Sequence, residues 1–106
     1  MKGRPTFAAM AAVLLGMSLA TATLAQTDVV RIDGPQSDGL LLDWCKGFGK
    51  RCGQPAADAF CRAEGYRRSV RFVQLVDPGK PTRVIGTGEI CSDPGCDSFR
   101  WIECRK

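Results

Sequence analysis

The stretch WCKGFGKRCGQPAADAFC, residues 44–61, decides how this chain can fold. Its second half predicts a helix, because Pro55 suits a first turn, where its missing N–H costs nothing, and Gly65 suits a C-terminal cap. Phe60 and Cys61 follow the helical spacing and are expected to face a core. The stretch also carries three of the six cysteines in the chain. A short helix tied to the rest of the chain by disulfides is therefore the starting point for the fold.

The first half of the stretch predicts one further helical turn. Asp43 can cap a turn that runs from Trp44 to Phe48, which the neighbouring glycines keep short. Trp44 and Phe48 are four residues apart and would share one face of that turn. In the longer helix, Asp58 is expected in the first turn, where the helix dipole favours a carboxylate.

Composition excludes several classes of enzyme. The chain has 106 residues, which is room for one domain, and it contains no histidine. Catalytic triads and Cys–His pairs use an imidazole as general base, so neither can be built, and histidine-ligated catalytic zinc is excluded with them. The cysteines also lack the C-x-x-C spacing of oxidoreductases. No catalytic residue, metal or cofactor is expected.

Residues 1–25 have the layout of a secretory signal peptide, with two basic residues, an apolar stretch over residues 7–20 and a cleavage site after Ala25. Cleavage after Ala22 is the alternative, and a membrane anchor is the competing interpretation. We expect a secreted or periplasmic protein that contacts a membrane only during export. Without this segment 13 basic and 11 acidic side chains remain, so the formal charge falls from +4 to +2. No nucleic-acid partner is therefore expected.

All six cysteines lie beyond the signal peptide. An even number of cysteines in a short exported chain predicts three disulfides, and a zinc site built from four of them is the alternative. A domain of this size gains little from its core beyond its entropy cost, whereas each disulfide can add ~2–4 kcal/mol. The cysteines are expected to hold the fold together.

The chain after the helix predicts three strands, over residues 69–76, 81–90 and 98–104, separated by two Asp-Pro-Gly turns. The predicted fold is a small disulfide-stapled α+β domain over residues 40–106, with one or two short helices packed on a three-stranded antiparallel meander. Residues 26–39 are polar and are expected to form a flexible N-terminal arm.

Closing both turns tightly gives a register for the meander. Val73 lies opposite Val84 in the first hairpin, and opposed side chains share a face of the sheet. The pairs in the second hairpin are Ile85–Ile102, Gly86–Trp101 and Gly88–Phe99. The aromatic rings of Trp101 and Phe99 would thus each cover the exposed backbone of a glycine on the neighbouring strand.

The same register predicts the disulfides. Cys91 faces Cys96 across the second turn, and Cys104 points toward the helix that carries Cys61. The expected bridges are Cys91–Cys96, Cys61–Cys104 and, with the remaining two cysteines, Cys45–Cys52.

One face of the predicted sheet is a candidate ligand-binding surface. It carries Trp101 and Phe99, with Arg71 and Glu103 on the same side, and such a surface could stack on sugar rings or receive a protein. The alternative is that residues 40–42 and Trp44 fold over this face as a second core layer, because large aromatic side chains are usually buried.

Other groups of residues are weaker candidates. The carboxylates available for glycoside hydrolysis are Asp43, Asp58, Glu64, Glu89 and Glu103, but a domain this small offers little room for a deep cleft. Asp93 and Asp97 fall short of the ligands that a calcium ion requires. Arg67, Arg68 and Arg71 are interpreted as a solvated start of a strand rather than as a site for an anionic polymer.

The pattern W-C-x6-C-G-x-P-A-A-D-x-F-C-x3-G-Y over residues 44–66, followed by the glycines and cysteines of residues 86–104, resembles a group of small exported cysteine-rich proteins, mostly bacterial. The resemblance covers nearly all of the predicted domain. It implies a single disulfide-stapled domain and supplies neither a substrate nor a catalytic residue.

The sequence favours a non-catalytic binding module that contacts a glycan or a cell-envelope polymer through its aromatic face. The alternative is a secreted inhibitor or toxin-like effector that binds an extracytoplasmic protein, and a small hydrolase is a third hypothesis.

Overall fold

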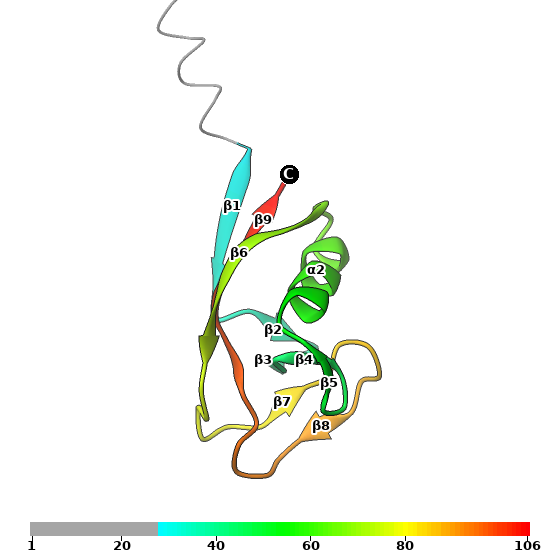
Figure 1. The fold of residues 1–106 in the computed structure, drawn as a ribbon, viewed down its shortest axis with the longest axis vertical. Coiled ribbons are helices and arrows are strands. Elements are labelled where there is room, and N and C mark those ends of the chain that lie inside the picture. Colours follow the sequence, from blue (N-terminus) through cyan, green and yellow to red (C-terminus); the bar gives the residue numbers. More distant parts are fainter. Residues whose placement is uncertain (1–27) are drawn as a thin grey trace, which may run out of the picture.

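The computed structural model describes residues 28–106, so the predicted signal peptide and its cleavage site lie outside the described residues. This part of the chain forms one helix and three small sheets (Figure 1). In chain order the elements are β1 (Val29–Asp33), β2 (Gln36–Ser37), β3 (Leu40–Leu42), β4 (Cys45–Gly47), β5 (Lys50–Cys52), α2 (Gln54–Ala63), β6 (Arg68–Leu75), β7 (Thr82–Arg83), β8 (Ile90–Cys91) and β9 (Ser98–Arg105).

The largest sheet is antiparallel and has the strand order β1-β9-β6. Strand β1 was expected to be part of a flexible arm over residues 26–39, and that prediction is wrong. Its side chains alternate between the two faces of the sheet. Val30 and Ile32 pack against the core, whereas Val29, Arg31 and Asp33 are exposed. This alternation explains why the segment pairs with β9 instead of remaining loose.

The predicted meander is also wrong. Strand β6 pairs directly with β9, so that Val73 lies opposite Trp101 rather than Val84. Of the predicted middle strand, residues 81–90, only β7 and the first residue of β8 are extended, and β7 pairs in parallel with β3 and antiparallel with β8. The four-stranded sheet β2-β3-β7-β8 that results lies beside the β1-β9-β6 sheet (Figure 1).

The glycines of the middle segment have a different role from the predicted one. The chain turns back after β7, where the N–H of Gly88 donates to the carbonyl of Val84 at 2.7 Å. The N–H of Gly86 donates to the carbonyl of Lys46 in β4 at 3.0 Å, and a Cβ on Gly86 would lie 2.4 Å from that oxygen. Gly86 therefore permits close backbone approach to β4, and it does not lie beneath Trp101.

Helix α2 confirms the predicted helix, and Phe60 and Cys61 are buried as expected. Asp58 is not in its first turn, because the helix begins at Gln54, and its carboxylate binds Ser69 at the start of β6. The predicted short helical turn is replaced by the hairpin β4–β5. Its tip carries Phe48, which is 51% exposed and does not share a face with the core residue Trp44.

The three disulfides are those expected, Cys45–Cys52, Cys61–Cys104 and Cys91–Cys96. Cys61–Cys104 joins α2 to β9 through the core, where both residues are fully buried. The Cys91–Cys96 disulfide is present even though the strand register from which it was predicted is wrong. Two cysteines five residues apart can meet across many kinds of turn. A mixed fold of strands and one helix, held by three disulfides, is therefore confirmed.

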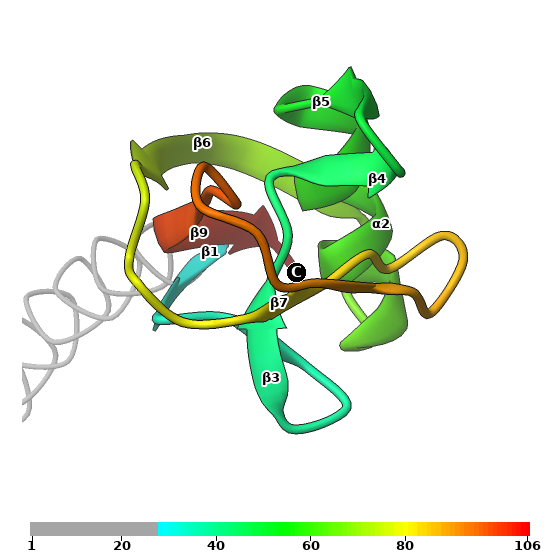
Figure 2. The same cartoon turned by 90° about the horizontal axis from the view of Figure 1, so that it is seen from below.

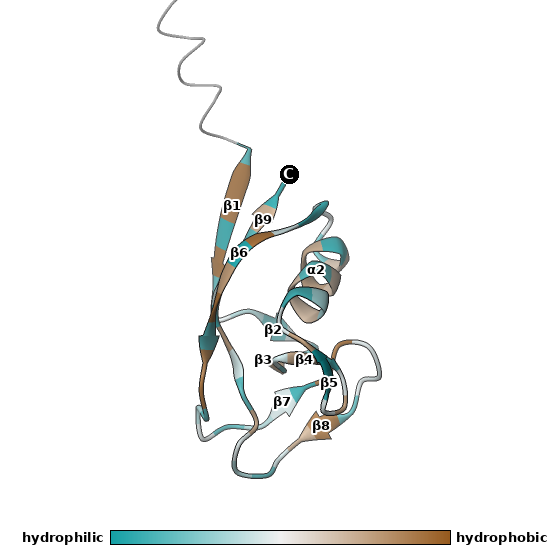
Figure 3. Cartoon of the chain, in the orientation of Figure 1, coloured by the Kyte–Doolittle hydropathy of each residue, from teal (hydrophilic) through white to brown (hydrophobic). Residues whose placement is uncertain are grey.

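The core lies between α2, β3 and one face of the β1-β9-β6 sheet (Figures 1 and 2). Trp44, Phe72 and Phe99 form an aromatic cluster there, with the ring centroids of Trp44 and Phe99 4.7 Å apart. Among the described residues, no helix or strand covers the opposite face of the sheet (Figures 1 and 2). Figure 3 shows hydrophobic and hydrophilic positions alternating along β1 at its edge.

Candidate functional site

The uncovered face of the β1-β9-β6 sheet presents nine side chains in three rows, one from each strand in every row. The strand register gives the rows as Val29–Arg105–Arg68, Arg31–Glu103–Arg71 and Asp33–Trp101–Val73. We call these nine residues the outer face. Three of the predicted site residues, Trp101, Arg71 and Glu103, lie together on it.

Glu103 connects the three strands of the outer face. Its Oε1 accepts a hydrogen bond from Nε of Arg71 at 2.9 Å, and its Oε2 accepts one from Nη2 of Arg31 at 3.3 Å. Its side chain is only 13% exposed, against 47% for Arg31 and 67% for Arg71. The hydrogen bond from Arg71 lowers the pKa of Glu103 below its usual range; desolvation opposes this effect, and the charge of Arg71 and the hydrogen bond and charge of Arg31 add to it.

Trp101 lies at the centre of the third row and is half-buried. The guanidinium carbon of Arg31 is 3.9 Å from the centroid of the Trp101 ring, and that of Arg71 is 5.9 Å away. Guanidinium groups over an indole face are attracted by the ring quadrupole, an effect worth ~0.5–1 kcal/mol at exposed sites. Side chains from both neighbouring strands therefore hold the ring in one orientation.

Phe99, the fourth predicted site residue, is not on the outer face. It is fully buried in the core, where it contacts Trp44. The cause is a shift of register, since Trp101 pairs with Val73 but Phe99 already pairs with the adjacent Gln74. The extra residue on β9 reverses the alternation of side chains, and so Phe99 and Trp101 point to opposite faces.

The alternative expectation, that residues 40–42 and Trp44 fold over the face of Phe99 and Trp101, is confirmed for Phe99 and wrong for Trp101. Leu42 belongs with Phe99 to the core cluster on the other side of the sheet, and Trp44 packs against that cluster. They do form a second core layer, but over the face that carries α2.

Sequence reasoning missed the contribution of β1 to this site. Arg31 stacks on Trp101, and Asp33 is the cross-strand neighbour of the ring. The available signal was the alternation of Val30 and Ile32 with polar residues, which is typical of a half-buried strand. The partner strand is near the other end of the sequence, so no local pattern could indicate which face of which sheet this strand would join.

The carboxylates considered for hydrolysis lie on different elements. Asp43 is buried and accepts hydrogen bonds from the N–H of Cys45 and the hydroxyl of Thr82. Glu64 and Glu89 are exposed, at the end of α2 and before β8 respectively. Asp43 therefore has a structural role, and Asp43, Glu64 and Glu89 lie in three different segments of the chain.

Asp58 is a structural carboxylate too. It accepts hydrogen bonds from the hydroxyl and N–H of Ser69 and from Gln54. Burial raises the pKa of Asp58, but the hydrogen bonds from Ser69 and Gln54, together with the charge of Arg62, hold it below its usual range. The carboxylate fastens α2 to the start of β6.

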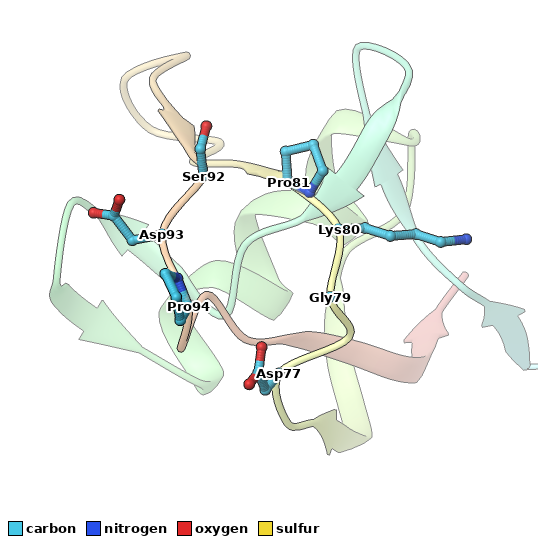
Figure 4. Close-up of a pocket in the computed structure, with 7 residues that line it drawn as sticks. All are labelled: Asp77, Gly79, Lys80, Pro81, Ser92, Asp93 and Pro94. Carbon is cyan, nitrogen blue, oxygen red and sulfur yellow. The ribbon is translucent and has the colours of Figure 1, made fainter.

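Neither a calcium site nor a deep pocket is found in the described part of the chain. Asp97 accepts hydrogen bonds from Gln74 and from the N–H of Asp77, and within residues 28–106 no three acidic or cysteine side chains gather to hold a metal ion. A pocket of about 350 Å³ lies between the loops that follow β6 and β8 (Figure 4). Its lining residues are Asp77, Gly79, Lys80, Pro81, Ser92, Asp93 and Pro94. No outer-face residue lines this pocket, nor the pockets beside Phe48 and beside Leu40.

No family model, curated protein or solved structure matches this chain. Within residues 28–106 no helix is long and apolar enough to cross a membrane. The outer face must therefore be interpreted from its own geometry and charge.

Proposed function

We propose that this protein is a small exported, non-catalytic binding module whose outer face contacts a glycan or a cell-envelope polymer. The observation that carries the proposal is Trp101, a half-buried aromatic side chain on the central strand of a sheet face that no other described element covers. An indole that is partly accessible and surrounded by polar groups is suited to contact the apolar side of a sugar ring.

The surroundings of Trp101 support a role in binding. Arg31 stacks on the ring, and Glu103 holds Arg31 and Arg71 at a fixed spacing on either side of β9. Groups that are already ordered before binding lose less conformational entropy when a ligand arrives. An open surface of this kind accommodates an extended polymer better than a small molecule, which needs a concave site.

Three disulfides within residues 28–106 are typical of proteins that work in an oxidising compartment. We place the protein in the periplasm or outside the cell, after removal of residues 1–25 near Ala25. Disulfide formation would then follow export.

The test is a glycan array probed with the oxidised protein and two matched variants. Trp101→Ala removes the aromatic ring from the outer face, and Phe48→Ala removes one that is 51% exposed on the β4–β5 hairpin. We expect Trp101→Ala to weaken binding about tenfold or more, as loss of a central aromatic contact does. Phe48→Ala should bind as the wild type does. Equal binding by all three proteins would remove the outer face from consideration.

A protein-binding function is the second candidate, and a different surface favours it. Phe48 and the loop closed by Cys91–Cys96 flank a shallow pocket, and Ile90 nearby along β8 is 50% exposed. Exposed apolar side chains beside a rigid loop are suited to a protein partner. The same two variants separate the candidates, because a secreted inhibitor or effector using this surface loses its target with Phe48→Ala and keeps it with Trp101→Ala.

A further inference from the structure

The direct pairing of Arg68 with Arg105 across β6 and β9 is a costly feature of the outer face. Both side chains point away from the core, because the adjacent pair, Ser69 and Cys104, is buried. Like charges placed directly opposite each other destabilise an antiparallel pair of strands. Every ion pair among the described residues involves Glu103, so none of them neutralises Arg68 or Arg105.

The outer face accounts for the whole net charge of the described residues. Only two basic residues precede residue 28, so the described chain holds 13 basic and 11 acidic side chains, an excess of two positive charges. The outer face alone holds four arginines and two acids, which is the same excess. The remainder of the described surface is therefore electrically balanced.

We propose that the polymer recognised by the outer face is an anionic polysaccharide, whose carboxylate groups bind Arg68 and Arg105. This inference rests on the proposed function and names its ligand class. A guanidinium group presents a rigid fork of donors that matches a carboxylate. A bound carboxylate would also relieve the repulsion between the two arginines, so the pairing that costs stability in the free protein favours the complex.

The second row of the outer face can extend the contact. Arg71 uses only Nε toward Glu103, and its terminal nitrogens have no hydrogen-bond partner among the described residues. The rows are separated by two residues of strand or slightly more, roughly 7 Å. A chain with repeating carboxylates can therefore meet both rows at once, and each further contact is intramolecular once the first has formed. A single small anion would gain only one such contact on an open surface.

A polysaccharide fits better than a nucleic acid. An excess of two basic side chains is far from the strongly basic composition of nucleic-acid-binding domains. Sugar rings can contact the part of Trp101 that Arg31 leaves accessible and the neighbouring Val73, which is 38% exposed.

The experiment measures binding of the oxidised protein to polygalacturonate, to its neutral methyl ester, to duplex DNA and to polyglutamate at equal ionic strength. The variant is Arg68→Gln/Arg105→Gln. The control, Lys50→Gln/Lys80→Gln, makes the same change of charge at exposed positions away from the outer face. Unfolding by urea is followed for each protein.

We expect polygalacturonate to bind more tightly than its ester, and the arginine variant to lose about tenfold or more of that affinity, since charge-assisted contacts are worth about this much. The lysine control should bind normally. The arginine variant should also be at least as stable as the wild type, because a repulsive pair has been removed.

Several results overturn the inference. Equal binding of polygalacturonate and its ester, abolished by Trp101→Ala, keeps the proposed function but makes the ligand neutral. Tighter binding of DNA or polyglutamate through the same arginines assigns the face to another class of macromolecule. Loss of affinity in the lysine control to the same degree shows a general charge effect. Binding to no glycan of any kind refutes both the inference and the proposed function.

Discussion

The most quantitative prediction compares two of the disulfides. Cys61–Cys104 joins residues 43 apart in the sequence, and Cys91–Cys96 joins residues five apart. In the chain-entropy description, closing loops of these lengths restricts the unfolded state by about 4 and about 2 kcal/mol respectively. Cys61→Ala/Cys104→Ala should therefore lower the free energy of unfolding by about 2 kcal/mol more than Cys91→Ala/Cys96→Ala does. Loss of two buried sulfur atoms from the core acts in the same direction.

The assay is equilibrium unfolding in urea, followed by tryptophan fluorescence, for the oxidised wild type and the two double variants. Domains of this size have a total stability of about 5–15 kcal/mol, so the Cys61/Cys104 variant can lie close to its unfolding midpoint in buffer. In that case, a titration with an osmolyte that favours the folded state extends the range of measurement. Equal losses in the two variants, or a larger loss from the short loop, would refute the reasoning from loop length.

Two further predictions follow from the packing of α2 and β4. Because the pKa of Asp58 is lowered on folding, its carboxylate stabilises the folded state above its unfolded pKa of about 3.9, and this contribution is lost as the pH falls through the lower folded pKa. Asp58→Asn should therefore reduce the difference between the free energies of unfolding measured in urea at about pH 6 and at about pH 2, which bracket this window. Glu64→Gln, at the exposed end of the same helix, serves as the charge control. Gly86→Ala should cost ~1–3 kcal/mol, because its Cβ would meet the carbonyl of Lys46. Gly47→Ala, whose Cβ has ordinary contacts 3.7 Å away, should change the urea midpoint little, and a similar loss in both variants would contradict the close-approach argument.

The parts of the fold that sequence reasoning predicted depend on neighbours in the chain. Helix α2 has a proline, an apolar spacing and a terminal glycine within twelve residues, and these signals act over one or two turns. The disulfides were predicted from an even cysteine count and from the register of the meander, and two of them join cysteines only seven and five residues apart, so that they form although the register is wrong. Trp101 and Glu103 were placed on one face because alternate residues of a strand share a face, whereas Arg71 was placed there by the meander register, which is wrong.

The parts that failed depend on partners that a local pattern cannot identify. Tight Asp-Pro-Gly turns favour hairpins between successive strands, but β9 instead pairs with β6 and with the distant β1. The prediction put Phe99 on the wrong face of the sheet because β9 has a single extra residue, a bulge without a distinctive sequence. The stacking of Arg31 on Trp101 required both the pairing with β1 and its register.

The central position of β9 has a consequence for the synthesis of the protein. This strand follows all its partners in the sequence, and the residues that it pairs with in β1 are at least 68 positions away. A growing chain can form α2, but the β1-β9-β6 sheet must wait until β9 has been made, and contacts over such distances form slowly. During that interval Cys61 lacks Cys104 and can meet Cys45 or Cys52 instead. Mispaired disulfides within residues 45–61 are therefore the expected by-product of premature oxidation, and the native set requires thiol–disulfide exchange to recover.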